Sequence, residues 1–143
     1  MRALSVVLAG QWAASREVGR IVADFEQRHR RRALLATDAG DVLLDLAQAA
    51  RLRDGDGLVL EDGGVIRVVA LAESRVEITA FDDRTLTRIA WHLGNRHLPV
   101  QVMRNRLRIR ADRTIEDMVE GLGGVSEAMQ AAFDPEPGAY DHG

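Results

Sequence analysis

Histidine is the residue type in this chain best suited to chemistry, and it occurs four times, at His29, His92, His97 and His142. Cysteine is absent, which excludes disulfides, thiolate nucleophiles and thiolate metal sites. Any metal site must therefore combine imidazole nitrogen with carboxylate or carbonyl oxygen. Neutral imidazole suits nickel, copper and zinc, so a site for one of these ions is the chemistry that the residue types allow.

Two of these histidines flank the end of a predicted helix, His92 inside its last turn and His97 just beyond it. Gly94 is expected to end the helix, and Pro99 to begin the next strand. The apolar residues recur at helical spacing: Leu86, Ile89, Ala90 and Leu93. The two histidines are five residues apart, whereas side chains on one helix face are three or four apart. On residue types alone, structural roles for both are slightly favoured over metal binding.

A homodimer would change the number of available ligands. Two His97 side chains that meet across a two-fold axis would give one metal ion two ligands, and His142 from each tail would add more. A site that is incomplete in one chain suits a carrier, which must both hold and release its ion.

The sequence contains no recognisable enzyme motif: no Gly-x-Ser-x-Gly, no His-Glu-x-x-His and no P-loop. We therefore predict no catalytic residue and no enzymatic activity.

The composition is that of a soluble globular protein: 143 residues, 46% hydrophobic, 29% charged and a net charge of −3. The acidic balance offers no broad basic surface for nucleic acid, and the basic run at 28–32 is interpreted as a solvated strand face. No stretch approaches the roughly 20 apolar residues of a membrane span. We expect a cytoplasmic protein without nucleic-acid or membrane partners.

The hydrophobic pattern predicts two domains of the α+β class. Short apolar runs separated by Gly and Asp turns indicate a small all-β domain over residues 1–73, although residues 18–25 fit a helix better than a strand by periodicity alone. Residues 74–133 follow the order β-α-β-β-α-β, which is the ferredoxin-like arrangement. There Asp82 or Asp83 can cap the first helix, and Thr114 with Asp117 resembles a capping box for the second. Residues 134–143 are predicted to be an extended, mobile tail.

One stretch carries a family resemblance. The run Ala90-x-His92-Leu93-Gly94-Asn95-Arg96-His97-x-Pro99-x-Gln101 resembles the signature of UreE, a family of urease accessory proteins, and weaker matches extend over nearly the whole chain. The resemblance implies an N-terminal β domain, which favours a strand over residues 18–25, followed by a ferredoxin-like metal domain.

The same resemblance implies a function. UreE proteins are homodimers that carry Ni(II) and pass it to a UreG-type GTPase in the urease maturation complex. Within the signature the metal ligand matches His97, the tail ligand matches His142, and His92 is left as structural. Zn(II) or Cu(II) can substitute for the nickel cargo because imidazole accepts all three ions. The alternative is a protein-interaction module of the maturation complex whose metal binding is incidental.

Overall fold

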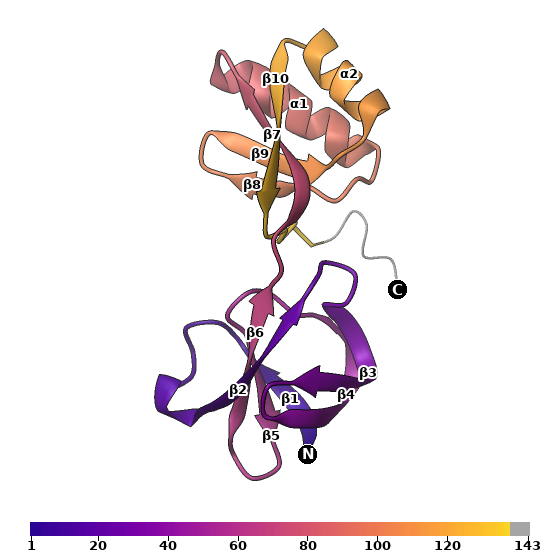
Figure 1. Ribbon diagram of the computed structural model, residues 1–143. Coiled ribbons are helices and arrows are strands. Elements are labelled where there is room, and N and C mark those ends of the chain that lie inside the picture. The colour runs from indigo at the N-terminus through magenta and orange to yellow at the C-terminus, as the bar shows by residue number, and fades with distance from the viewer. Residues whose placement is uncertain (138–143) are drawn as a thin grey trace. The chain divides into compact units, whose positions relative to one another are not determined.

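The computed structural model describes residues 1–137, and the chain divides into two compact units, Met1–Leu71 and Ala72–Gly143 (Figure 1). Each unit has its own sheet and its own hydrophobic core. No helix within residues 1–137 has the length and apolar character needed to cross a membrane.

The N-terminal unit is a six-stranded mixed sheet in the order β2-β6-β5-β1-β4-β3. Residues 18–25 lie mostly in a strand, as the family resemblance predicts and contrary to their periodicity. A short 3-10 helix, Ala14–Arg16, precedes the second strand. The strands are β1 (Arg2–Val7), β2 (Glu17–Ala23), β3 (His29–Thr37), β4 (Gly40–Arg51), β5 (Gly57–Leu60) and β6 (Val65–Ala70).

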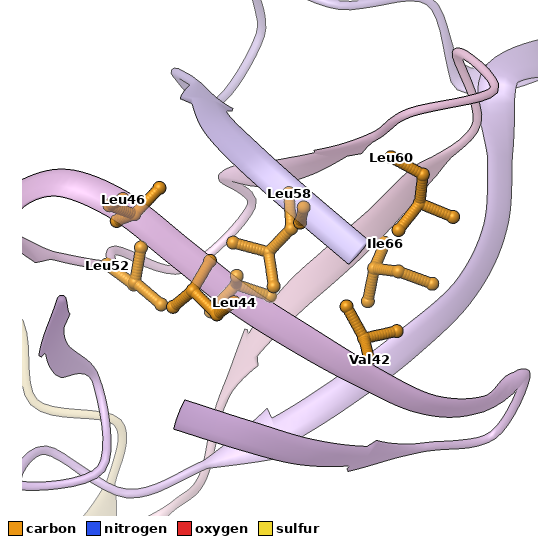
Figure 2. Close-up of a cluster of buried hydrophobic side chains, with 9 residues drawn as sticks. Val42, Leu44, Leu46, Leu52, Leu58, Leu60 and Ile66 are labelled. Carbon is orange, nitrogen blue, oxygen red and sulfur yellow. The ribbon is translucent and has the colours of Figure 1, made fainter. Parts of the chain in front are cut away.

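Alternation along β4 builds the core of this unit. Val42, Leu44 and Leu46 are buried while the residues between them are less so, as expected when successive side chains point to opposite faces of a sheet. They pack with residues of the neighbouring strands and turns, among them Leu52 and Leu58 (Figure 2). Fully burying one such side chain contributes about 1.5–3 kcal/mol relative to leaving it in water.

The basic run at 28–32 is only partly the solvated face that its composition predicts. Arg30, Arg31 and Arg32 are exposed on β3, but Arg28 is fully buried. Its backbone N–H donates to the Asp24 carbonyl at 3.1 Å, which closes a turn just before the strand. Its Nη1 donates to the Leu52 carbonyl at 3.1 Å, so the prediction of a solvated residue is wrong at this position.

The C-terminal unit has the predicted β-α-β-β-α-β order and is ferredoxin-like, which confirms the α+β class. Its antiparallel sheet has the order β10-β7-β9-β8. Buried residues of β7, β9 and both helices form a single cluster, so the two helices cover the same face. The elements are β7 (Glu73–Ala80), α1 (Asp83–Asn95), β8 (Gln101–Met103), β9 (Arg106–Arg110), α2 (Arg113–Gly121) and β10 (Gly124–Ala131).

Side-chain caps begin both helices. Asp82 accepts a hydrogen bond from the Thr85 N–H at 2.8 Å, and the Thr85 hydroxyl and N–H together lower the pKa of the Asp82 carboxyl. Asp112 caps α2 by accepting from the Ile115 N–H at 3.2 Å. The predicted capping box is wrong in its residues, since Glu116 rather than Asp117 reaches back, accepting from the Asp112 N–H at 3.0 Å.

Candidate metal centre

His97 lies just past the end of α1, in a turn defined by two backbone hydrogen bonds. The His97 N–H donates to the Gly94 carbonyl at 2.9 Å, and the Leu98 N–H donates to the Leu93 carbonyl at 3.2 Å. This pair is the Schellman motif, in which the residue before the second donor takes a left-handed conformation. Leu93 and Leu98 both belong to the hydrophobic cluster of this unit, which supplies the apolar contact typical of the motif.

The left-handed position of this motif is usually glycine, and here it is His97, with a φ of 57°. An L-residue with a Cβ pays roughly 1–2 kcal/mol for that conformation, because the Cβ approaches the following carbonyl oxygen. The helix ends at Asn95, within the predicted Gly94-Asn95 stop, but the left-handed reversal falls on His97 rather than on Gly94. Pro99 explains the stop, because the residue before a proline avoids the helical region and proline itself lacks the N–H.

The same turn shortens the next strand. The sequence predicts a strand that begins at Pro99, but β8 spans only Gln101–Met103. The Leu98 N–H already donates to the Leu93 carbonyl at the helix end, and Pro99 has no N–H to donate to a neighbouring strand. The His97 side chain is thus carried on an exposed turn between a helix end and a strand rather than inside an element.

His92 occupies the last turn of α1 and is half-buried. Its ring meets the Trp91 ring edge-on, with the centroids 5.0 Å apart and an interplanar angle of 87°. Trp91 itself is 63% exposed. The His92 ring thus packs against the Trp91 ring on the helix surface.

Within residues 1–137, no cluster of three or more His, Asp or Glu side chains is close enough together to hold an ion. His29 is in the other unit, where its Nδ1 lies 3.2 Å from Nη2 of Arg51. His142 lies outside the described residues.

The chain beyond β10 approaches the end of α1. A cavity of about 160 Å³ is lined on one side by helix and turn residues and on the other by residues of the C-terminal segment. The lining includes Ala90, Gly94 and Leu98 on the first side and Glu136 and Pro137 on the second. Pro137, the last described residue, is thus near Gly94 and Leu98, the latter adjacent in sequence to His97.

Comparison with known families covers both units. Residues 4–71 match the N-terminal domain of the UreE urease accessory protein, and residues 73–143 match its C-terminal domain. The chain belongs to the UreE family. The boundary between the two matches falls where the structure separates its two units.

Urease accessory proteins UreE from several bacteria are similar to this chain. The protein from Rhodopseudomonas palustris strain BisB18 is 52% identical over 141 residues, which cover 98% of this chain and 66% of that protein. The protein from R. palustris strain HaA2 is 55% identical over 84% of this chain and 56% of its own length. The protein from Beijerinckia indica is 45% identical over 98% of this chain and 81% of its own length. The chain thus spans 56–66% of the length of the first two UreE relatives.

The sequence pattern did not predict two structural features of this region. The left-handed His97 was concealed by the nearby Gly94-Asn95 pair, although Pro99, two residues beyond His97, is a common follower of such a cap. The role of Gln101 was also missed. Its Oε1 accepts a hydrogen bond from the Asp134 N–H at 2.9 Å, a contact across 33 residues that no local pattern signals.

Proposed function

We propose that this chain is a nickel carrier that takes part in urease maturation, with one ion held between two subunits. His97 from each subunit supplies the central ligands, and His142 from the tails completes the site. The observation that carries the proposal is the exposed His97 in a left-handed turn position that normally favours glycine. Backbone strain of this kind concentrates at functional sites, where the side chain is needed.

The ligand chemistry supports nickel as cargo. Without cysteine the site is built from imidazole and oxygen donors, which suit Ni(II) and also accept Zn(II) and Cu(II). A site shared between two subunits needs no three-ligand group within one chain, and residues 1–137 contain none.

The chain length supports a contribution from the tail. Five residues connect Pro137 to His142, and an extended chain of that length reaches at most about 18 Å. Pro137 starts beside Gly94 and Leu98, so the His142 imidazole has reach enough for the His97 turn.

Transfer would proceed by ligand exchange. A partner's donors would first replace the tail histidines and then the two His97 imidazoles. The expected partner is a UreG-type GTPase of the urease maturation complex. The names of the relatives, urease accessory protein UreE, support a role in urease maturation.

Nickel titration by calorimetry, with the molar mass from light scattering, tests the proposal. We expect one nickel ion per two chains in the wild type, and loss of that binding in His97→Ala while the dimer persists. His92→Ala and His29→Ala are the matched controls, and both should bind nickel as the wild type does. Undiminished binding in His97→Ala would overturn the site.

A protein-interaction module with incidental metal binding is the alternative. In that case His97→Ala would lose nickel and yet support urease activation in cells at the wild-type level. The carrier proposal expects urease activity to fall in that variant when nickel is scarce.

A further inference from the structure

The described segment that follows β10 crosses the C-terminal sheet from one edge strand to the other. We call residues 132–137 the strap. The last pair on β10 is Ala131 with Glu73, at one edge of the sheet. The strap ends near Val100 and Val102, beside β8 at the opposite edge. Three strand spacings separate these edges, about 14 Å at 4.8 Å each.

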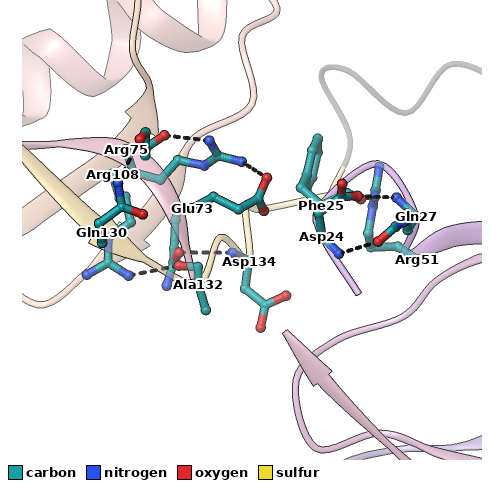
Figure 3. Close-up of polar contacts among 12 residues, drawn as sticks. Asp24, Phe25, Gln27, Arg51, Glu73, Arg75, Arg108, Gln130, Ala132 and Asp134 are labelled. Carbon is teal, nitrogen blue, oxygen red and sulfur yellow. Dashed lines mark hydrogen bonds and ion pairs between the residues drawn. The ribbon is translucent and has the colours of Figure 1, made fainter. Parts of the chain in front are cut away.

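Hydrogen bonds tie the strap to successive strands as it crosses. Nη1 of Arg108 on β9 donates to the Ala132 carbonyl at 3.0 Å (Figure 3). The Asp134 N–H then donates to Oε1 of Gln101 on β8. Farther on, the Glu136 N–H donates to the Val100 carbonyl at 2.8 Å.

Phe133 anchors the strap through its side chain. The residue is fully buried, and the Arg75 guanidinium lies over its ring at 4.8 Å from the centroid. Arg75 is itself held by Glu73 at 2.9 Å. A cation over an aromatic face that is shielded from water is attracted more strongly than one exposed to solvent, so this contact attaches the strap to β7.

We infer that the strap is a positioning device for the proposed nickel site, which holds the start of the tail beside the His97 turn and thereby raises the effective concentration of His142 there. This inference rests on the proposed function. Without the strap, the chain would leave the sheet at β10, the far edge. The connection to His142 would then grow from five residues after Pro137 to eleven after Ala131.

The expected size of the effect follows from linker length. For a flexible connection, effective concentration falls roughly as the −3/2 power of length, so this lengthening lowers it about threefold per tail. With two tails per site, release of both straps should weaken nickel binding about tenfold.

Two variants release the strap in different ways. Phe133→Ala removes the buried anchor. Glu136→Pro removes the N–H that donates to the Val100 carbonyl and leaves every buried side chain in place, which keeps the test valid if Phe133→Ala does not fold. Glu136→Ala is the matched control, because it keeps the backbone donor.

A readout that needs no metal tests the position of the tail. The chain has no cysteine, so a single Gly143→Cys change accepts a nitroxide label, whose approach broadens nearby amide signals in NMR. We expect broadening of the amides of residues 94–98 in the wild type and in Glu136→Ala, and much weaker broadening in Phe133→Ala and Glu136→Pro. Equal broadening in all four would overturn the strap as a positioning device.

Nickel affinity by calorimetry tests the link to the metal site. Phe133→Ala and Glu136→Pro should weaken binding about tenfold, and neither should weaken it further in a His142→Ala background, since coupled residues are not additive. An equal weakening in that background would overturn the inference. Loss of broadening with unchanged affinity would overturn it too while leaving the His97 site intact. Wild-type affinity in His97→Ala would instead overturn the proposed function.

Discussion

At the scale of single residues, His97 combines two properties that oppose each other. Its imidazole is the proposed ligand, while its φ of 57° is one that a side chain disfavours. We therefore predict that His97→Gly and His97→Ala both lose nickel but differ in stability. The free energy of unfolding should be about 1 kcal/mol higher for His97→Gly than for His97→Ala, because only alanine keeps a Cβ in the left-handed position. Thermal unfolding should show a melting temperature about 4–8 °C higher for His97→Gly in a unit of this size.

The pair of variants separates function from strain because neither carries an imidazole. Equal melting temperatures would mean that the turn after α1 relaxes out of the left-handed conformation when the side chain shrinks. In that case the backbone at His97 would not be imposed by the hydrogen bonds of Leu98 and His97 to the helix end.

The family resemblance indicated His97 as the ligand, whereas residue types alone slightly favoured a structural role, and neither predicted its backbone conformation. The left-handed residue is held by two hydrogen bonds to the helix end and by apolar residues, Leu93 and Leu98, of the same cluster. The Gly94-Asn95 pair, three and two residues earlier, is the stronger stop signal in the sequence and so drew the prediction away from His97. The composition of the basic run predicted a solvated Arg28, but this residue is buried. The carbonyl that accepts the hydrogen bond from its guanidinium belongs to Leu52, 24 residues away.

At the scale of elements, the N-cap of α1 makes a testable contribution to acid stability. We predict that Asp82→Ala destabilises the C-terminal unit near neutral pH, whereas Asp83→Ala, just inside the helix, has little effect. The pKa of Asp82 is lowered in the folded state by hydrogen bonds from Thr85, so its contribution is fully present above the unfolded carboxyl pKa of about 3.9. That contribution is lost as the pH falls through the lower, folded pKa.

Urea unfolding at a series of pH values measures this effect. The difference in free energy of unfolding between wild type and Asp82→Ala should be constant above about pH 5. It should shrink toward zero on acidification below about pH 4. A difference that persists unchanged at pH 2 would show that the Asp82 carboxylate is not the stabilising group.

Periodicity and capping residues predicted most elements of the C-terminal unit, because both helices have apolar faces at helical spacing and aspartates at their starts. The strap could not be predicted in the same way. Its composition around Pro135 and Pro137 suggested only an extended tail, and its attachment depends on donors and acceptors from β8, β9 and the residues before β8. Long-range contacts of this kind leave no trace in local sequence.

At the scale of the whole molecule, the carboxyl groups that stabilise the fold determine how its stability depends on pH. Besides Asp82, two carboxyls of the N-terminal unit have lowered pKa values. Hydrogen bonds from Arg67 and then Arg20 lower the pKa of Glu17, and a hydrogen bond from Arg2 lowers that of Asp45. Because all three shifts are downward, the stability they contribute is present above the ordinary carboxyl pKa values of about 4 and is lost only below them.

Metal binding should respond at higher pH. Imidazole binds metal only when it is neutral, and in short peptides it titrates near pH 6.5. We therefore predict a window of about pH 4.5–6 in which the protein remains folded but has released its nickel. Such a separation suits a carrier, because local protonation or ligand exchange can discharge the ion without unfolding the chain.

Far-UV circular dichroism and nickel calorimetry on the same samples from pH 8 to pH 3 test this window. Nickel affinity should fall steeply between pH 7 and pH 5.5 while the dichroism spectrum stays constant, and the spectrum should change only below about pH 4. Simultaneous loss of nickel and of secondary structure would mean that the metal site depends on the fold's carboxylates rather than on imidazole. Affinity that is unchanged at pH 5 would exclude histidine as the dominant ligand.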